Sequence, residues 1–182
     1  MIELLFWGEN MEVNYQKTTQ LNTDIISVKQ SIGVMSLLLI PSKKILIFLV
    51  KIIRKILFKK LDELSNLLKE NQDVFPSEYY DCIEINDMIK YTLKRDTSLI
   101  KPEDFNFVND MHDSFFDLIL YKLKLLKDND CEFNENFYNN FNPKYNEFNE
   151  DLIKFKEYFY SNIQQESFDE QDMIDYLKIA WE

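Results

Sequence analysis

The chain contains very little glycine, alanine and histidine: among 182 residues there are two Gly, one Ala and one His. Loops that bind phosphate through their backbone need several glycines, because the chain must approach the ligand closely at positive φ. A metal site of several histidines is excluded, since His112 is the only one. The scarcity of glycine also argues against an all-β protein, whose turns and bulges use it. We therefore expect no cofactor, no metal and no catalytic residue.

Cysteine is scarce as well, and this bears on the compartment. Cys82 and Cys131 are far apart in a chain long enough to fold without disulfides, so we expect reduced thiols and a cytoplasmic protein. The first residues carry Glu3 where a signal peptide needs a base, and Met11 is an alternative start. Ala, Gly, Pro and Arg, which have GC-rich codons, total only nine residues. This composition is typical of an AT-rich gene, either a bacterial accessory gene or part of an AT-rich genome.

Hydrophobic residues make up 46% of the chain and aromatic residues 15%, which is enough for a sizeable core. We expect an all-α fold, with residues 1–182 forming a single compact domain of five to seven helices, either a bundle or a short helical solenoid. Residues 1–22 either join this domain or form a loosely ordered N-terminal segment. Apolar periodicity predicts helices over 42–70, 77–95, 102–127, 143–164 and 168–181, and a sixth over 23–40 whose Leu37–Ile40 run is alternatively a buried strand.

The prolines and polar clusters mark where these helices begin. Ser77 occupies a predicted N-cap, and Pro102 and Pro143 are expected as first helical residues. Ser167 and Glu170 form a capping box before the last helix. The connecting loops are expected over 71–76, 96–101 and 128–142, the last with room for a short aromatic helix.

The net charge of −11 is unevenly distributed. Residues 1–60 carry nine basic and four acidic side chains, whereas residues 61–182 carry 12 basic and 28 acidic ones. The first third is therefore net positive and the remainder strongly negative. An acidic surface repels nucleic acid and attracts a basic partner, although an acidic surplus also serves solubility.

The segment 42–70 is amphipathic, with a basic arc opposite an apolar one. Its charges argue against a membrane span, because each would be costly at the centre of a bilayer. We favour a core helix whose basic arc docks against the chain's own acidic helices, and the alternative is a helix lying on an anionic membrane through residues 43–60. The basic arc consists of Lys43, Lys44, Lys51, Arg54, Lys55 and Lys59, and the apolar arc of Leu46, Leu49, Val50, Ile53, Ile56, Leu57, Leu64, Leu67 and Leu68.

Two acidic helix faces and one aromatic cluster are the candidate partner-binding residues. Like charges at helical spacing destabilise a helix unless a base offsets them, within the fold or on a partner. Solvated faces are the simpler interpretation. The first face consists of Asp110, Asp113 and Asp117, the second of Asp169, Glu170, Asp172 and Asp175, and the aromatic cluster of Phe137, Tyr138 and Phe141. The stripe at Tyr145, Phe148, Leu152, Phe155, Phe159 and Ile163 is predicted to be core, as is His112.

These features predict a cytoplasmic inhibitor of the immunity-protein or antitoxin type. Its acidic helical faces would neutralise a basic toxin, such as a nuclease, by covering the surface that binds phosphate. The alternative is a peripheral protein that docks on a membrane surface through residues 43–60. A third hypothesis is an enzyme with a site built only from carboxylates. The sequence favours a basic protein partner over nucleic acid or membrane and leaves the oligomeric state open.

Overall fold

A computed structural model describes residues 15–38, 47–95 and 101–164. The described residues form five α-helices and contain no strand, so the predicted all-α fold is confirmed, as a bundle. A π-helical turn, η1, continues the last helix. The elements are α1 (Tyr15–Leu38), α2 (Ile47–Glu70), α3 (Glu78–Lys94), α4 (Pro102–Asp128), α5 (Glu135–Tyr158) and η1 (Phe159–Gln164).

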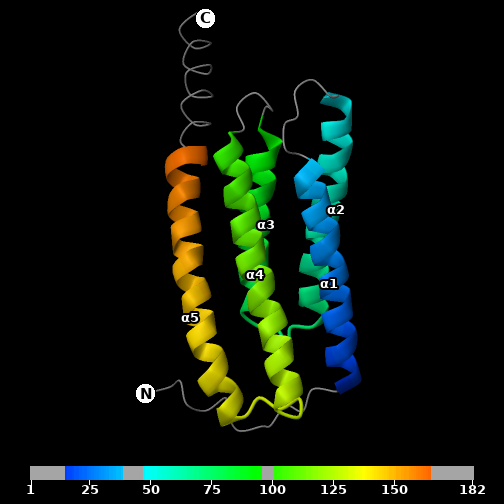
Figure 1. Ribbon diagram of the computed structural model, residues 1–182, viewed down its shortest axis with the longest axis vertical. Helices are drawn as coiled ribbons and strands as arrows, with labels where there is room; N and C mark the ends of the chain where they lie inside the picture. Colours follow the sequence, from blue (N-terminus) through cyan, green and yellow to red (C-terminus); the bar gives the residue numbers. More distant parts are fainter. Residues whose placement is uncertain (1–14, 39–46, 96–100, 165–182) are drawn as a thin grey trace, which may run out of the picture.

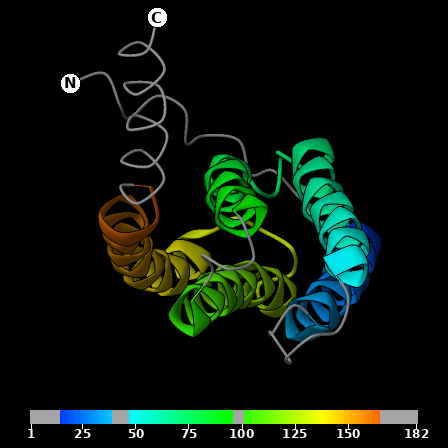
Figure 2. The ribbon, with the colours of Figure 1, turned by 90° about the horizontal axis from the view of Figure 1, so that it is seen from above.

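Successive helices run in alternating directions along the long axis of the molecule (Figure 1). Seen from above, α5, α4 and α1 form one layer, and α3 and α2 form the other (Figure 2). The central helix is α4, which packs against α1 on one side, α5 on the other and α3 across the layers. This position leaves one long face of α4 directed outward between α1 and α5.

The core is aliphatic where α1 and α2 contribute to it, and mixes aliphatic with aromatic side chains where α4 and α5 do. Leu57, Leu61, Leu64 and Leu68 of α2 follow helical spacing and are almost fully buried. Each such leucine contributes about 1.5–3 kcal/mol when removed from water. The stripe predicted in the helix over 143–164 is confirmed as core, with four members buried and Tyr145 and Phe155 half-buried against it.

The helix predicted at 143–164 begins eight residues earlier, at Glu135, so Pro143 is not its first residue. Asn134 caps it, since its side-chain oxygen accepts a hydrogen bond from the backbone N–H of Phe137 at 2.9 Å. Pro143 lies inside the helix instead. The loop between α4 and α5 is therefore shorter than the predicted 128–142, because it ends where α5 begins at Glu135. The expected aromatic helix near Phe137 is the first turn of α5.

Other predicted helix starts have mixed outcomes. Pro102 begins α4 as predicted, and Asp104 in its first turn accepts a hydrogen bond from the backbone N–H of Lys101 at 2.9 Å. Ser77 occupies the N-cap of α3, but its side chain makes no capping hydrogen bond. Residues 15–22 are helical, because α1 begins at Tyr15 and buries Thr18 and Leu21.

None of the helices within the described ranges combines the length and the apolar character needed to cross a bilayer. The helix predicted at 168–181, with its capping box at Ser167 and Glu170, lies outside the described residues.

Candidate partner-binding surfaces

Asp110, Asp113 and Asp117 lie on the outward face of α4, and we call them the acidic stripe. All three are exposed, and the side chains of Asp113 and Asp117 are 70% and 65% accessible. The opposite face of α4 buries Met111 and Phe115, as the apolar spacing predicted. The stripe is therefore presented to solvent along the middle of the molecule.

One base from α1 lies beside the acidic stripe. The Lys29 ammonium is 3.1 Å from Asp117 Oδ1, 3.9 Å from Asp113 Oδ1 and 5.8 Å from the centre of the Phe116 ring. Exposed ion pairs of this kind contribute about 0–1 kcal/mol each. Lys29 is thus a base within the fold that partly offsets the repulsion within the stripe.

The acidic surface continues from α4 onto α5. The Ser114 hydroxyl of α4 donates to Asp151 Oδ2 of α5 at 3.5 Å. A hydrogen bond to Glu147 raises the pKa of Lys144, and the charges of Asp117 and Asp151 raise it further. Lys144 and Lys154 each bind an acid three residues away on α5 itself. These two lysines therefore form their ion pairs with acids of α5 and not with the acidic stripe.

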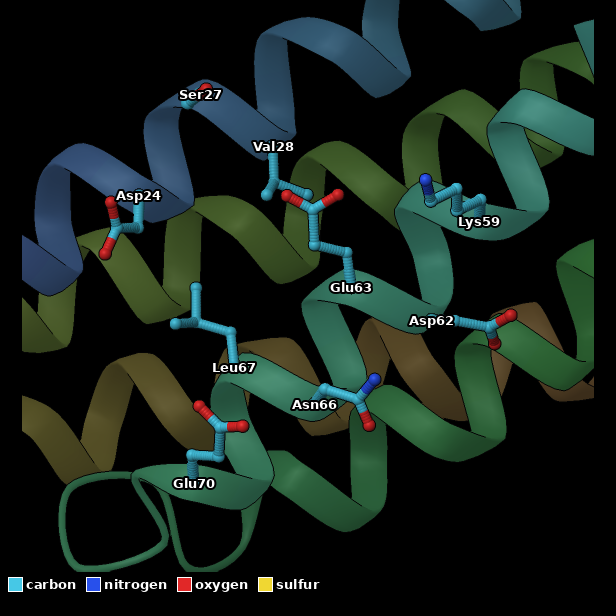
Figure 3. Close-up of a pocket in the computed structure, with 9 residues that line it drawn as sticks. All are labelled: Asp24, Ser27, Val28, Lys59, Asp62, Glu63, Asn66, Leu67 and Glu70. Atoms are coloured by element: carbon cyan, nitrogen blue, oxygen red, sulfur yellow. The ribbon is translucent and has the colours of Figure 1, made fainter.

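A second surface, which we call the acidic groove, is a groove of about 490 Å³ between α1 and α2, lined by four acids and by Lys59 (Figure 3). Asp24 enters it from α1, and Glu63 and Glu70 enter it from α2, with the Glu63 carboxylate directed towards Val28 across the groove (Figure 3). Lys60 binds Glu63 at 2.7 Å, and Gln20 binds Asp24 at 2.8 Å. Sequence reasoning missed this groove, because it forms only where α1 and α2 become neighbours in the fold.

The N-terminal half of α2 presents a basic surface. Lys51, Lys55 and Lys59 are exposed, with Ile52 and Ile56 exposed beside them, and we call these five residues the basic face of α2. Within the described part of the chain none of the three lysines forms an ion pair. These three lysines of the predicted basic arc are therefore exposed, whereas Arg54 of the same arc donates a hydrogen bond to the backbone carbonyl of Arg95. Ile56, assigned to the apolar arc, is 39% exposed.

The aromatic cluster at Phe137, Tyr138 and Phe141 lies inside the bundle rather than on its surface. Phe137 is 0% exposed and Phe141 7%, and Tyr138 is half-buried against Phe133. Because α5 begins at Glu135, these residues extend its buried stripe by two turns. Phe137 and Phe141 thus stabilise the core and are not available to a partner in this conformation.

A buried ion pair joins α3 to α4, and a ring of α5 lies beside it. The Lys122 ammonium of α4 lies 2.6 Å from Glu78 Oε1 of α3, and both side chains are at most 5% exposed. Phe141 of α5 is the nearest of three phenylalanine rings around this ammonium, at 4.9 Å. Burial lowers the pKa of Lys122, and Glu78 opposes this shift. Such a pair fixes how the helices meet, at a cost in desolvation.

The remaining polar and sulfur side chains of interest are also internal. His112 is 7% exposed, as predicted, and Cys82 and Cys131 are buried and free. Burial raises the pKa of the Cys82 thiol to about 12, so this thiol is unreactive at neutral pH. Over the described ranges no three His, Cys, Asp or Glu side chains lie close enough to hold a metal ion.

The acidic face predicted at Asp169, Glu170, Asp172 and Asp175 lies outside the described residues. Of the predicted partner-binding residues, the structure therefore places Asp110, Asp113 and Asp117 together on the surface. Comparisons with protein-family models, with curated proteins and with solved structures found no match to this chain.

Proposed function

We propose that this chain is a cytoplasmic, protein-binding inhibitor of the immunity-protein or antitoxin type. The proposed partner is a basic toxin, such as a nuclease. The observation that carries the proposal is the acidic stripe: three exposed carboxylates on one helix face, with Lys29 as the base beside them among the described residues.

The electrostatics of the acidic stripe suit an inhibitor of a phosphate-binding protein. Carboxylates spaced along a helix occupy the positions that phosphates would take on a basic surface, so partner and nucleic acid compete. Opposite charges also accelerate capture, because long-range attraction steers the two proteins together. The acidic groove lies on the other side of α1, which neighbours both α2 and α4. A partner seated over α1 would thus meet carboxylates on both sides.

The helix scaffold makes the stripe rigid, and this also favours inhibition. The buried face of α4 packs against α1, α3 and α5, so the three carboxylates keep a fixed spacing. A pre-organised surface loses less conformational entropy on binding than a loop does. The stripe therefore needs no folding step before it captures a partner.

The test begins with capture of partners from an extract of the source organism, followed by association kinetics with the purified partner. The variant Asp110→Asn, Asp113→Asn, Asp117→Asn should fold normally, since all three positions are exposed. Its association rate constant should fall about tenfold or more at low salt, and its dependence on salt should flatten. The measurement is stopped-flow mixing at two salt concentrations.

A matched control removes the same charge elsewhere, through Asp87→Asn, Glu103→Gln and Glu157→Gln, which are exposed acids off the stripe. This control should keep nearly the wild-type association rate. Equal slowing by both triple variants would attribute the effect to net charge alone, and unchanged rates in the stripe variant would refute the proposed binding surface.

A further inference from the structure

The N-terminal half of α2 combines a local excess of positive charge with exposed apolar side chains. From Ile47 to Leu61 the helix contains five basic residues and no acidic one. Lys51, Lys55 and Lys59 follow one another at intervals of four, so their side chains lie on one surface of the helix. Within the described part of the chain none of them is neutralised by an ion pair.

Apolar surface accompanies these lysines. Ile52 and Ile56 are each 39% exposed, one turn apart on the flank of the lysine row. A shallow hollow of about 590 Å³ runs over this part of α2 and is lined by Ile56 and Phe58 between the stems of the lysines. Lysine stems can cover apolar surface while their ammonium groups remain in water or reach a polar headgroup.

One acid beside the lysines is already engaged in an ion pair. Asp62, at the end of the hollow, forms an ion pair with Lys90 of α3. A further base, Lys94 of α3, lies near the hollow, since its ammonium is 6.0 Å from the centre of the Phe58 ring. Lys59 also lines the acidic groove beside Glu63, so positive charge is concentrated at Lys51 and Lys55, although the whole chain carries a net charge of −11.

We infer that the basic face of α2 docks on the surface of an anionic lipid bilayer. Lysines attracted to anionic headgroups, together with isoleucines that enter the boundary of the acyl chains, are the two elements of interfacial helix binding. Nucleic acid would match the charge, but it offers no partner for the two isoleucines. This inference is independent of the proposed inhibitor function, which uses other residues.

The acidic stripe does not prevent this docking. It lies on α4, in the other layer of the bundle from α2 (Figure 2). Packed helices are about 8–10 Å apart, so charges on the outer faces of two layers are separated by more than one Debye length, which is about 8 Å at physiological salt. The membrane would thus interact mainly with the lysines nearest to it.

The experiment measures flotation of the full chain with vesicles of phosphatidylglycerol and phosphatidylcholine, and with vesicles of phosphatidylcholine alone. Wild type should float only with the anionic vesicles. The variant Lys51→Gln, Lys55→Gln, Lys59→Gln should lower the partition coefficient on the order of a hundredfold, because each lysine contributes about fivefold. Absence of flotation by wild type, or equal flotation with both vesicle types, would overturn the inference.

Matched variants separate this surface from charge in general. Lys69→Gln, Lys124→Gln and Lys154→Gln remove three exposed lysines elsewhere and should reduce the partition coefficient much less. If they reduce it as much as the α2 variant does, the basic face is not the docking surface. A duplex oligonucleotide is tested in parallel, and lysine-dependent binding to it without vesicle binding would also refute the membrane as the partner.

A fluorescent label reports the orientation on the bilayer. A polarity-sensitive dye on Ile56→Cys should shift to the blue with anionic vesicles, whereas a dye on Ile153→Cys of α5 should not, although Ile153 is more exposed, at 56%. The native thiols of Cys82 and Cys131 are buried and react slowly. Equal shifts at both positions would contradict docking through α2.

Discussion

At the scale of single residues, His112 is a buried side chain whose pKa is far from its ordinary value. Its ring lies edge-on against Phe116, with centroids 4.9 Å apart, and its Nε2 has no hydrogen-bond partner among the described residues. Burial, and to a smaller degree the charge of Lys29, lower the pKa of His112 from 6.5 to about 3. The folded protein therefore holds this imidazole neutral where an unfolded chain would protonate it.

This shift predicts a loss of stability as the pH falls from about 6.5 towards 3. The unfolded chain binds a proton in that range and the folded chain does not, so the free energy of unfolding falls by about 1.4 kcal/mol per pH unit from this residue. Between pH 7 and pH 5 the contribution is about 2 kcal/mol. Urea unfolding of wild type and His112→Leu at both pH values measures it.

Because the chain has no other histidine, the difference in pH dependence between wild type and His112→Leu reports the titration of His112 alone. Between pH 7 and pH 5 the free energy of unfolding should fall by about 2 kcal/mol less in His112→Leu than in wild type, whatever the stability of the variant at pH 7. A Ser114→Ala variant, two residues away on the same helix, should keep the wild-type dependence. Identical pH dependence in wild type and His112→Leu would mean that the imidazole is solvated in the folded protein.

At the scale of helices, α5 shows how a local signal can mislead. Pro143 suits the first turn of a helix, and the sequence gives no direct sign that it lies inside one. The cap at Asn134 and the inward spacing of Phe137 and Phe141 start the helix earlier. Burying these two rings outweighs the backbone hydrogen bond that Pro143 cannot donate.

Replacing this proline should therefore stabilise the protein. Pro143→Ala restores an N–H that can donate to the carbonyl of Asn139, and it removes the clash of the ring with that carbonyl. Greater freedom of the unfolded chain opposes this gain by about 0.4–1 kcal/mol. We expect a net increase of about 1–2 kcal/mol in the free energy of unfolding, measured by urea denaturation.

Pro76→Ala provides the control, since Pro76 is exposed in the turn between α2 and α3. It should leave stability unchanged or lower it slightly, because there the ring only restricts the unfolded chain. A loss of stability in Pro143→Ala comparable to that in Pro76→Ala would show that α5 accommodates its proline without strain.

For the whole molecule, the parts that could be predicted are those with local signals. The expected helices at 42–70, 77–95 and 102–127 agree with α2, α3 and α4 to within a few residues at all the ends that the structure describes. Helical spacing of apolar residues and the position of Pro102 are properties of neighbouring residues, so one sequence contains them. The exposure of the acidic stripe follows from the same spacing.

The parts that could not be predicted depend on which helices become neighbours. Lys29 meets Asp117 across 88 positions of the sequence. The acidic groove unites Asp24 with Glu63 from different helices. The basic arc at the start of the helix predicted over 42–70 was expected to dock internally because the chain has ample acid, but its lysines Lys51, Lys55 and Lys59 are exposed. The numbers of acidic and basic residues indicate which ion pairs are possible, but the packing of the helices determines which ion pairs form.

The same charge distribution predicts how the fold responds to salt. The chain carries 32 acidic and 21 basic side chains, and the acidic stripe and acidic groove concentrate like charges on its surface. Net charge of this size destabilises a compact state by self-repulsion, which salt screens. Surface ion pairs such as Lys17–Asp73 and Lys156–Glu84 act in the opposite direction, but each contributes only about 0–1 kcal/mol. Repulsion should dominate.

Thermal unfolding, followed by circular dichroism, should therefore give a higher midpoint at high salt than at low salt. A gain of about 1 kcal/mol corresponds to about 2–4 °C for a chain of this size. The variant Asp110→Asn, Asp113→Asn, Asp117→Asn should respond less, because part of the repulsion is already removed. Lys29→Gln should respond more, since it removes the base beside the stripe. A midpoint that falls with salt would mean that the ion pairs outweigh the repulsion, and the acidic stripe would then already be balanced within the fold.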